Sequence, residues 1–203
     1  MRDIKAVVFD FGGVVFDWSA DYLYRELIPD ETKRRWFLSN VCTPAWNLQQ
    51  DGGRLVADAE AELIAKHPEY EDLIRAFYGQ WPKTLRGTLD DGVALVEELY
   101  AAGVPLYGLT NWSAETFPYV ENRYDFLKRF RHIVVSGRIK MIKPEPRIYH
   151  HLLEHVGEKA EACVFIDDAP HNAEGARAIG MQAIQHRSGA ETAAALRQMG
   201  VKF

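Results

Sequence analysis

A chain of 203 residues with 47% apolar and 26% charged residues has the composition of a globular protein, not of a disordered one. Its formal net charge of −5 supplies no basic footprint for nucleic acid, so we expect no nucleic-acid partner. The two cysteines form no CxxC motif, which favours a reducing cytoplasm. Asp10 and Asp17 interrupt the apolar N-terminal run, which therefore predicts neither a signal peptide nor a membrane partner.

Short apolar runs alternate with longer helical patterns along most of the chain. The first run, residues 4–9, is rich in valine and is followed by an acid and two glycines, which predicts a buried strand. Further strands are predicted at 104–109, 133–135, 163–166 and 182–185, and helices at 90–102, 146–156 and 169–179. This repetition predicts an α/β fold, with a parallel sheet that carries helices on both faces.

The region between residues 19 and 84 breaks this rhythm. It contains no convincing strand, but helical patterns cover 21–28, 31–40, 55–66 and 70–79. Such an insert directly after the first strand predicts a second, smaller helical unit that overhangs one edge of the sheet. We therefore expect a core of residues 1–18 and 85–203 and a helical cap of residues 19–84.

Four distant stretches carry reactive groups. They are Asp10 in AVVFDFGGVV, Thr110 in VPLYGLTNWS, Lys143 in MIKPEPRIY and the pair Asp167-Asp168 in CVFIDDAPHN. Three of the four follow a predicted strand, and the carboxyl ends of parallel strands gather ligands at one edge of a sheet. A nucleophilic carboxylate, a hydroxyl, an ammonium and a pair of acids suffice for phosphoryl transfer.

These stretches resemble the four motifs of the haloacid dehalogenase-like (HAD) hydrolase superfamily, in the expected order. The matching strings are VVFDFGGVVFDW, LTNWS, MIKPEPRIYHHLLEHVG and FIDDAPHNAEGARAIG. The chain is most similar to small-capped sugar-phosphate phosphatases of the glucose-1-phosphate type and to the N-terminal phosphatase domain of soluble epoxide hydrolases. The resemblance implies a Rossmann-like core with a helical cap inserted after the first strand.

The resemblance also implies a magnesium site. Asp10 is expected to attack phosphorus and to form an aspartyl-phosphate. In this superfamily the main-chain oxygen two positions after the nucleophile binds Mg²⁺, which here is that of Gly12. Asp167 and Asp168 supply further hard oxygens of the kind that Mg²⁺ prefers. We therefore predict Asp10, Gly12, Asp167 and Asp168 as metal ligands, with Asn172 nearby.

Three further residues are expected to hold the phosphate. Lys143 can neutralise charge on Asp10 and on the transferred phosphoryl group. Thr110 can donate its hydroxyl to the same phosphate oxygens, and Asn111 is a further predicted contact for phosphate or substrate. Trp46, beside Asn47, is a candidate substrate-facing element of the cap.

Position 12 departs from the usual pattern of these phosphatases. Most of them have a second Asp there, which protonates the leaving oxygen and later activates water, whereas this chain has Gly12. Such assistance is typically worth about 10²- to 10⁴-fold in rate. The enzyme can use good leaving groups such as anomeric sugar phosphates, another acid such as Asp17 can substitute, or the aspartyl-phosphate hydrolyses slowly.

The sequence therefore predicts a cytoplasmic, Mg²⁺-dependent phosphatase that cleaves a small phosphomonoester, for example a sugar phosphate. One alternative is a 2-haloacid dehalogenase that turns Asp10 against carbon, although the acid pair counts against it. The other is a phosphate-binding pseudoenzyme, which is suggested by Gly12.

Overall fold

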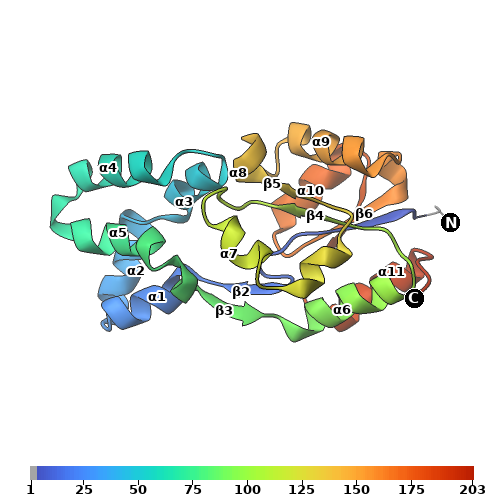
Figure 1. The fold of residues 1–203 in the computed structure, drawn as a ribbon, viewed down its shortest axis with the longest axis horizontal. Helices are drawn as coiled ribbons and strands as arrows, with labels where there is room; N and C mark the ends of the chain where they lie inside the picture. The colour runs from blue at the N-terminus through green and yellow to red at the C-terminus, as the bar shows by residue number, and fades with distance from the viewer. Residues whose placement is uncertain (1–3) are drawn as a thin grey trace.

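The computed structural model describes residues 4–203, and its centre is a five-stranded parallel sheet in the order β5-β4-β1-β6-β7 (Figure 1). β1 (Ala6–Phe9) is the middle strand. The other strands are β4 (Leu106–Thr110), β5 (His132–Val135), β6 (Cys163–Asp167) and β7 (Gln182–Gln185). The predicted fold class, a parallel sheet with helices on both faces, is confirmed.

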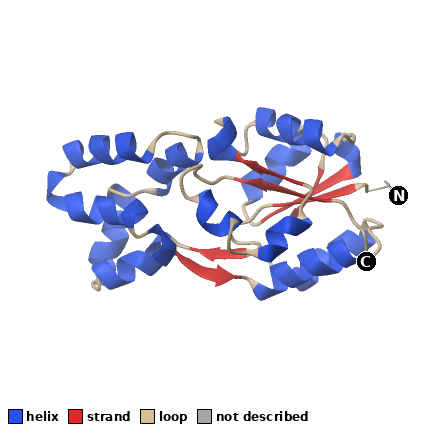
Figure 2. Cartoon of the chain, in the orientation of Figure 1, coloured by secondary structure: helices blue, strands red, loops and turns tan. Residues whose placement is uncertain are grey.

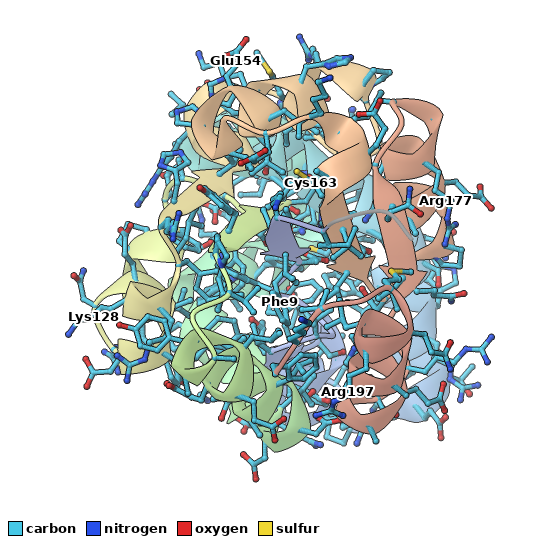
Figure 3. All side chains as sticks on the ribbon, turned by 90° about the vertical axis from the view of Figure 1, so that its right-hand side faces the viewer. Phe9, Lys128, Glu154, Cys163, Arg177 and Arg197 are labelled. Carbon is cyan, nitrogen blue, oxygen red and sulfur yellow. The ribbon has the colours of Figure 1, made fainter. Side chains whose placement is uncertain are left out.

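Alternate residues of the strands face two separate hydrophobic cores. Val7 and Phe9 of β1 join one core, and Ala6 and Val8 join the other, because successive side chains of a strand point to opposite faces. The first core is covered by α6 (Asp90–Ala101) and α11 (Gly189–Gln198), and the second by α9 (Pro146–Val156) and α10 (Pro170–Ala178). Figure 3 shows Phe9 and Cys163 in this interior, with the labelled charged side chains at the periphery.

Five helices form a separate group at one end of the molecule (Figures 1 and 2), which we call the helical unit (residues 20–79). They are α1 (Ala20–Leu27), α2 (Glu31–Asn40), α3 (Pro44–Asp51), α4 (Val56–Lys66) and α5 (Glu71–Gly79). The unit has its own hydrophobic core, which includes Tyr24, Phe37 and Phe77. The division of the chain into a core and a cap at residues 18 and 84 stays a prediction.

Helix α3 is missing from the sequence prediction. Thr43 and Pro44 resemble a turn in sequence, but here they begin a helix. The hydroxyl oxygen of Thr43 accepts a hydrogen bond from the Trp46 N–H at 3.1 Å, and Pro44 occupies the first turn, where its missing N–H costs nothing.

A two-stranded antiparallel ribbon joins the helical unit to the rest of the chain. It consists of β2 (Phe16–Trp18) and β3 (Leu85–Thr88), so both connections to the helical unit run through it (Figure 2). Strands this short and this exposed carry no periodic signal, and the sequence did not predict them. The remaining short elements are α7 (Phe117–Glu121), α8 (Ser136–Ile139) and the 3₁₀ turns η1 (Pro68–Tyr70), η2 (Trp81–Thr84), η3 (Asp125–Arg129) and η4 (Ala160–Ala162).

Within residues 4–203, no helix combines the length and the apolar character that crossing a membrane requires.

Candidate active site

Three of the predicted site residues lie at the carboxyl ends of adjacent strands. Asp10 follows β1, and Thr110 and Asp167 end the neighbouring strands β4 and β6. β1 lies between β4 and β6, and the strand that follows β1 in the sheet lies on one side of it, whereas the strand that follows β6 lies on the other side. Ligand sites of open α/β sheets lie at such a reversal of strand order. Lys143 reaches the same point from the loop between α8 and α9.

The ammonium of Lys143 bridges two carboxylates. Its Nζ lies 2.8 Å from Asp10 Oδ1 and 2.7 Å from Asp167 Oδ2. All three side chains are buried, so these contacts are shielded from solvent. The structure therefore brings together groups from positions 10, 143 and 167 of the chain, as the sequence predicts.

Asp168 completes a cluster of three acids. One carboxylate oxygen from each of Asp10, Asp167 and Asp168 lies within 4.8 Å of the others. The Asp168 carboxylate sits over Gly13, where φ is +70° and where a Cβ would meet Asp168 Oδ2 at 2.5 Å. A glycine is thus required at position 13 by both the backbone conformation and the close approach. Three converging carboxylates are a donor set that fits Mg²⁺.

The charges of this cluster are unbalanced. Burial and the neighbouring Asp167 charge raise the pKa of Asp10 to about 8, although Lys143 opposes this shift. Burial also raises the pKa of Asp168, with a further contribution from Asp167. Burial acts to lower the pKa of Lys143, but the charges of Asp10 and Asp167 outweigh it and the pKa is raised. Three carboxylates thus face one ammonium, and a divalent cation would compensate the excess negative charge.

Asn172 supports the cluster from α10. Its Nδ2 donates to both carboxylate oxygens of Asp167 at 3.1 Å, and the Ala169 N–H donates to Asp167 Oδ1 at 2.9 Å. The Oδ1 atom of Asn172 is buried and has no hydrogen-bond partner among the described residues. A buried acceptor of this kind leaves room for a donor brought by a ligand or by water.

Thr110 and Asn111 lie in the same place but differ in their contacts. Thr110 is buried and lines a cavity with Asp10, Gly12 and Lys143, which we call the central cavity. Asn111 also lines it, but its side-chain amide is engaged with Lys143. Its Oδ1 accepts from the Lys143 N–H at 2.9 Å, and its Nδ2 donates to the Lys143 carbonyl at 3.1 Å. Asn111 therefore holds the Lys143 loop in place, and its contact with phosphate stays a prediction.

The far wall of the central cavity comes from the helical unit, and sequence reasoning missed most of it. The wall includes Asn47 and Asp51 of α3 and Tyr78 of α5, with Trp18 and Trp81 from the ribbon region. The Tyr78 hydroxyl donates to Asn47 Oδ1 at 2.8 Å, and Asn47 Nδ2 donates to Asp51 Oδ2 at 3.0 Å. The i, i+4 spacing of Asn47 and Asp51 was a usable signal, but only once α3 is known to be a helix.

Two residues considered from the sequence lie elsewhere. Asp17, considered as a replacement acid, does not line the central cavity, and its Oδ1 accepts from the Tyr22 hydroxyl at 2.6 Å. Trp46 is buried within the helical unit against Phe77 and does not face the central cavity.

A second cavity adjoins the central one and shares Trp18, Asn47 and Asp51 with it. We call it the apolar cavity, because most of its other lining residues are Ala20, Leu38, Cys42, Pro44, Ala45, Leu48 and Phe77 of the helical unit. The remaining ones, Ser19, Asp21, Thr43 and His171, are polar. The two cavities therefore lie next to each other, and Asp51 contributes to the lining of both.

A model of haloacid dehalogenase-like hydrolases matches residues 4–180 of this chain. The chain belongs to this family. The resemblance drawn from the four motifs is thus confirmed, and the protein is a hydrolase.

Two curated relatives are phosphatases by name. Phosphatase MT3486 of Mycobacterium tuberculosis (strain CDC 1551 / Oshkosh) is 31% identical over 201 residues, which cover 92% of this chain and 89% of that protein. Sesquiterpene phosphatase astK of Aspergillus oryzae is 26% identical over 195 residues, which cover 96% of each chain. The predicted likeness to epoxide hydrolases is partial, since the match to rat bifunctional epoxide hydrolase 2 spans 36% of this chain.

Among solved structures, the HAD family enzyme bt-2542 of Bacteroides thetaiotaomicron, in a magnesium complex, superimposes with a TM-score of 0.73. It is 21% identical, and the match covers 97% of this chain and 100% of that one. At this identity the similarity establishes the fold.

Proposed function

We propose that this protein is a Mg²⁺-dependent phosphatase that cleaves a small phosphomonoester through an aspartyl-phosphate on Asp10. The observation that carries the proposal is the buried Lys143 ammonium held between the carboxylates of Asp10 and Asp167, with Asp168 beside them. It supports the proposal because Asp10 and Lys143 line one cavity, and the acid cluster to which Asp10 belongs could bind a cation beside it.

The chain's own residues divide the work. A carboxylate oxygen of Asp10 attacks phosphorus, and the bond between phosphorus and the ester oxygen breaks. Lys143 and Thr110 stabilise the equatorial phosphoryl oxygens, while Asn111 fixes the Lys143 backbone. Asp10, Asp167, Asp168 and the main-chain oxygen of Gly12 would hold Mg²⁺, which would supply positive charge to bind the phosphate.

The relatives support this chemistry. Two of them are named phosphatases, and the structural neighbour bt-2542 is described in complex with magnesium. The acid cluster favours phosphate over a halogenated carbon, because attack on carbon needs no cation.

The test is phosphate release from a panel of phosphomonoesters with and without Mg²⁺. We expect turnover that requires Mg²⁺ and is lost in Asp10→Asn. Asp17→Asn is the matched control, because Asp17 is an aspartate outside the central cavity that contacts Tyr22. Turnover that persists in EDTA or in Asp10→Asn would refute the proposal. Halide release from 2-haloacids without metal would identify the dehalogenase, and phosphate binding without turnover would identify the pseudoenzyme.

The apolar cavity bears on the substrate class. It shares Asp51 with the central cavity, which would hold the phosphate. Its largely apolar walls favour an ester of an apolar alcohol over a sugar phosphate, whose hydroxyls would have to leave water for that surface. One relative, sesquiterpene phosphatase astK, is named for an apolar substrate.

Primary alkyl phosphates of increasing length test this preference. Each buried methylene is worth about 0.8 kcal/mol, or about fourfold in kcat/KM, until the cavity is full. A sugar phosphate turned over faster than every alkyl phosphate would argue for the sugar-phosphate prediction instead.

A further inference from the structure

Because position 12 is a glycine and not an aspartate, the site has an empty volume where an acidic side chain would lie. A Cβ built on Gly12 would meet no atom of the described residues within 4 Å, apart from its two chain neighbours, so the space above this residue is open. Gly12 lines the central cavity together with Asp10 and Asp51. The leaving group of a phosphate attacked by Asp10 can therefore occupy this space, facing the wall that the helical unit contributes.

Asp51 is the carboxyl group that the helical unit places in this wall. It is the last residue of α3, and it is held in several ways. Asn47 Nδ2 donates to its Oδ2 at 3.0 Å, and Asn47 is fixed in turn by the Tyr78 hydroxyl. The main-chain oxygen of Asp51 accepts from the Ser136 hydroxyl at 2.5 Å, which ties the end of α3 to α8. These contacts fix the carboxyl group of Asp51 in the wall of the central cavity.

The surroundings of Asp51 favour its protonated form. Burial raises its pKa to about 8, against the opposing influence of a main-chain hydrogen bond from Ser113 and the charge of Lys143. The titratable groups that share the central cavity with it are Asp10, Lys143 and Tyr78, and those that share the apolar cavity are Asp21, Cys42 and His171. A carboxyl group that still holds its proton near neutral pH has the state that a general acid needs.

We propose that Asp51 is the general acid and base of this enzyme, in the role that the Asp missing at position 12 has in related phosphatases. The assignment rests on the proposed function. The carboxyl proton of Asp51 passes to the ester oxygen as the bond between that oxygen and phosphorus breaks, and the alcohol leaves. The resulting Asp51 carboxylate then takes a proton from water as the water oxygen attacks the aspartyl-phosphate. This step releases inorganic phosphate and restores the Asp10 carboxylate and the protonated Asp51 side chain.

The position of Asp51 at the junction of the two cavities agrees with this role. A phosphate attacked by Asp10 would lie in the central cavity, and an alcohol that extends into the apolar cavity would pass Asp51, which lines both. The ester oxygen that joins the two would then lie near Asp51. Asp17, the acid considered from the sequence, borders neither cavity.

The experiment compares four variants on two substrates, an alkyl phosphate with a poor leaving group and 4-nitrophenyl phosphate with a good one. The variants are Asp51→Asn, Gly12→Asp, the double variant with both changes, and Asp17→Asn as control. We expect Asp51→Asn to slow the alkyl phosphate by about 10²- to 10⁴-fold and 4-nitrophenyl phosphate by less than about tenfold. The wild-type rate on the alkyl phosphate should fall at alkaline pH, and this fall should vanish in Asp51→Asn.

Gly12→Asp provides the decisive arm, because the open space above Gly12 admits an aspartate side chain. The double variant should turn over the alkyl phosphate at least about tenfold faster than Asp51→Asn does. Equal losses on both substrates, an unchanged pH profile or no rescue would overturn the assignment while leaving the phosphatase intact. A wild-type protein that releases phosphate from neither ester would overturn the proposed function and this assignment with it. Circular dichroism of each variant separates loss of chemistry from loss of fold.

Discussion

Replacement of Lys143 by methionine tests the charge balance of the site. The Lys143 ammonium lies 2.8 and 2.7 Å from two buried carboxylates, and the lysine side chain is 1% exposed. At an effective dielectric constant of about 20, each contact is worth about 6 kcal/mol of attraction, which is offset by several kcal/mol of desolvation per ion. Removing one partner of such a buried network costs about 3–5 kcal/mol, because the remaining charges are left uncompensated.

For a chain of this length, that loss corresponds to a fall of about 6–20 °C in Tm. The assay is thermal unfolding of Lys143→Met in EDTA and again with saturating Mg²⁺. We expect the fall to be smaller with Mg²⁺, because a bound cation compensates the same carboxylates. The second change Asp10→Asn, made in the Lys143→Met background, should recover part of the loss in EDTA by removing one of the uncompensated charges.

Lys83→Met is the matched control. Its ammonium lies 2.7 Å from Glu26, but the two side chains are 49% and 60% exposed. An exposed pair of this kind is worth about 0–1 kcal/mol, so this variant should unfold almost like the wild type. A fall in Tm for Lys143→Met no larger than for Lys83→Met would refute the reasoning.

Three further predictions concern residues in and around the site. Gly13→Ala should weaken activation by Mg²⁺, measured as the concentration for half-maximal activity, because its Cβ would displace Asp168; Gly103→Ala, with a similar positive φ but open space around it, is the control and should keep that concentration. The pKa of Asp51 is raised on folding from 3.8 to about 8, so the folded state loses stability as pH rises through this range, and the Tm of Asp51→Asn relative to the wild type should be higher at pH 8 than at pH 5. Ser136→Ala removes the hydrogen-bond partner of the buried Trp112 N–H and of the half-buried Asp51 carbonyl, and should lower the unfolding free energy by about 1–3 kcal/mol in urea titration; an unchanged midpoint would show that these contacts contribute nothing.

The sequence predicts the sheet side of the site well, because the information is local. Asp10, Thr110 and Asp167 each stand at the end of an apolar run, and the end of a parallel strand is a fixed place in the fold. Lys143 has no such strand before it, and its place followed from the resemblance of its motif. Once the strand order is correct, the side chains of Asp10, Thr110 and Asp167 lie at the same edge of the sheet.

The side contributed by the helical unit depends on docking between distant segments, which no local pattern encodes. Asp51 reaches the central cavity because Ser136, far along the chain, holds the end of α3, and α3 itself begins at a Thr-Pro pair that also marks turns. The ribbon of β2 and β3 was missed for a related reason. Two strands of three and four residues stabilise each other by pairing, and neither is recognisable alone.

The nucleophile and the proposed proton donor belong to different bodies, and the chain passes between them only through the ribbon of β2 and β3. In the proposed mechanism, bond cleavage therefore requires the helical unit to be docked as in this structure, because only then do Asp10 and Asp51 line the same cavity. The hydrogen bond between the Ser136 hydroxyl and the Asp51 carbonyl, which holds this arrangement, becomes a requirement of the chemistry as well as of the fold.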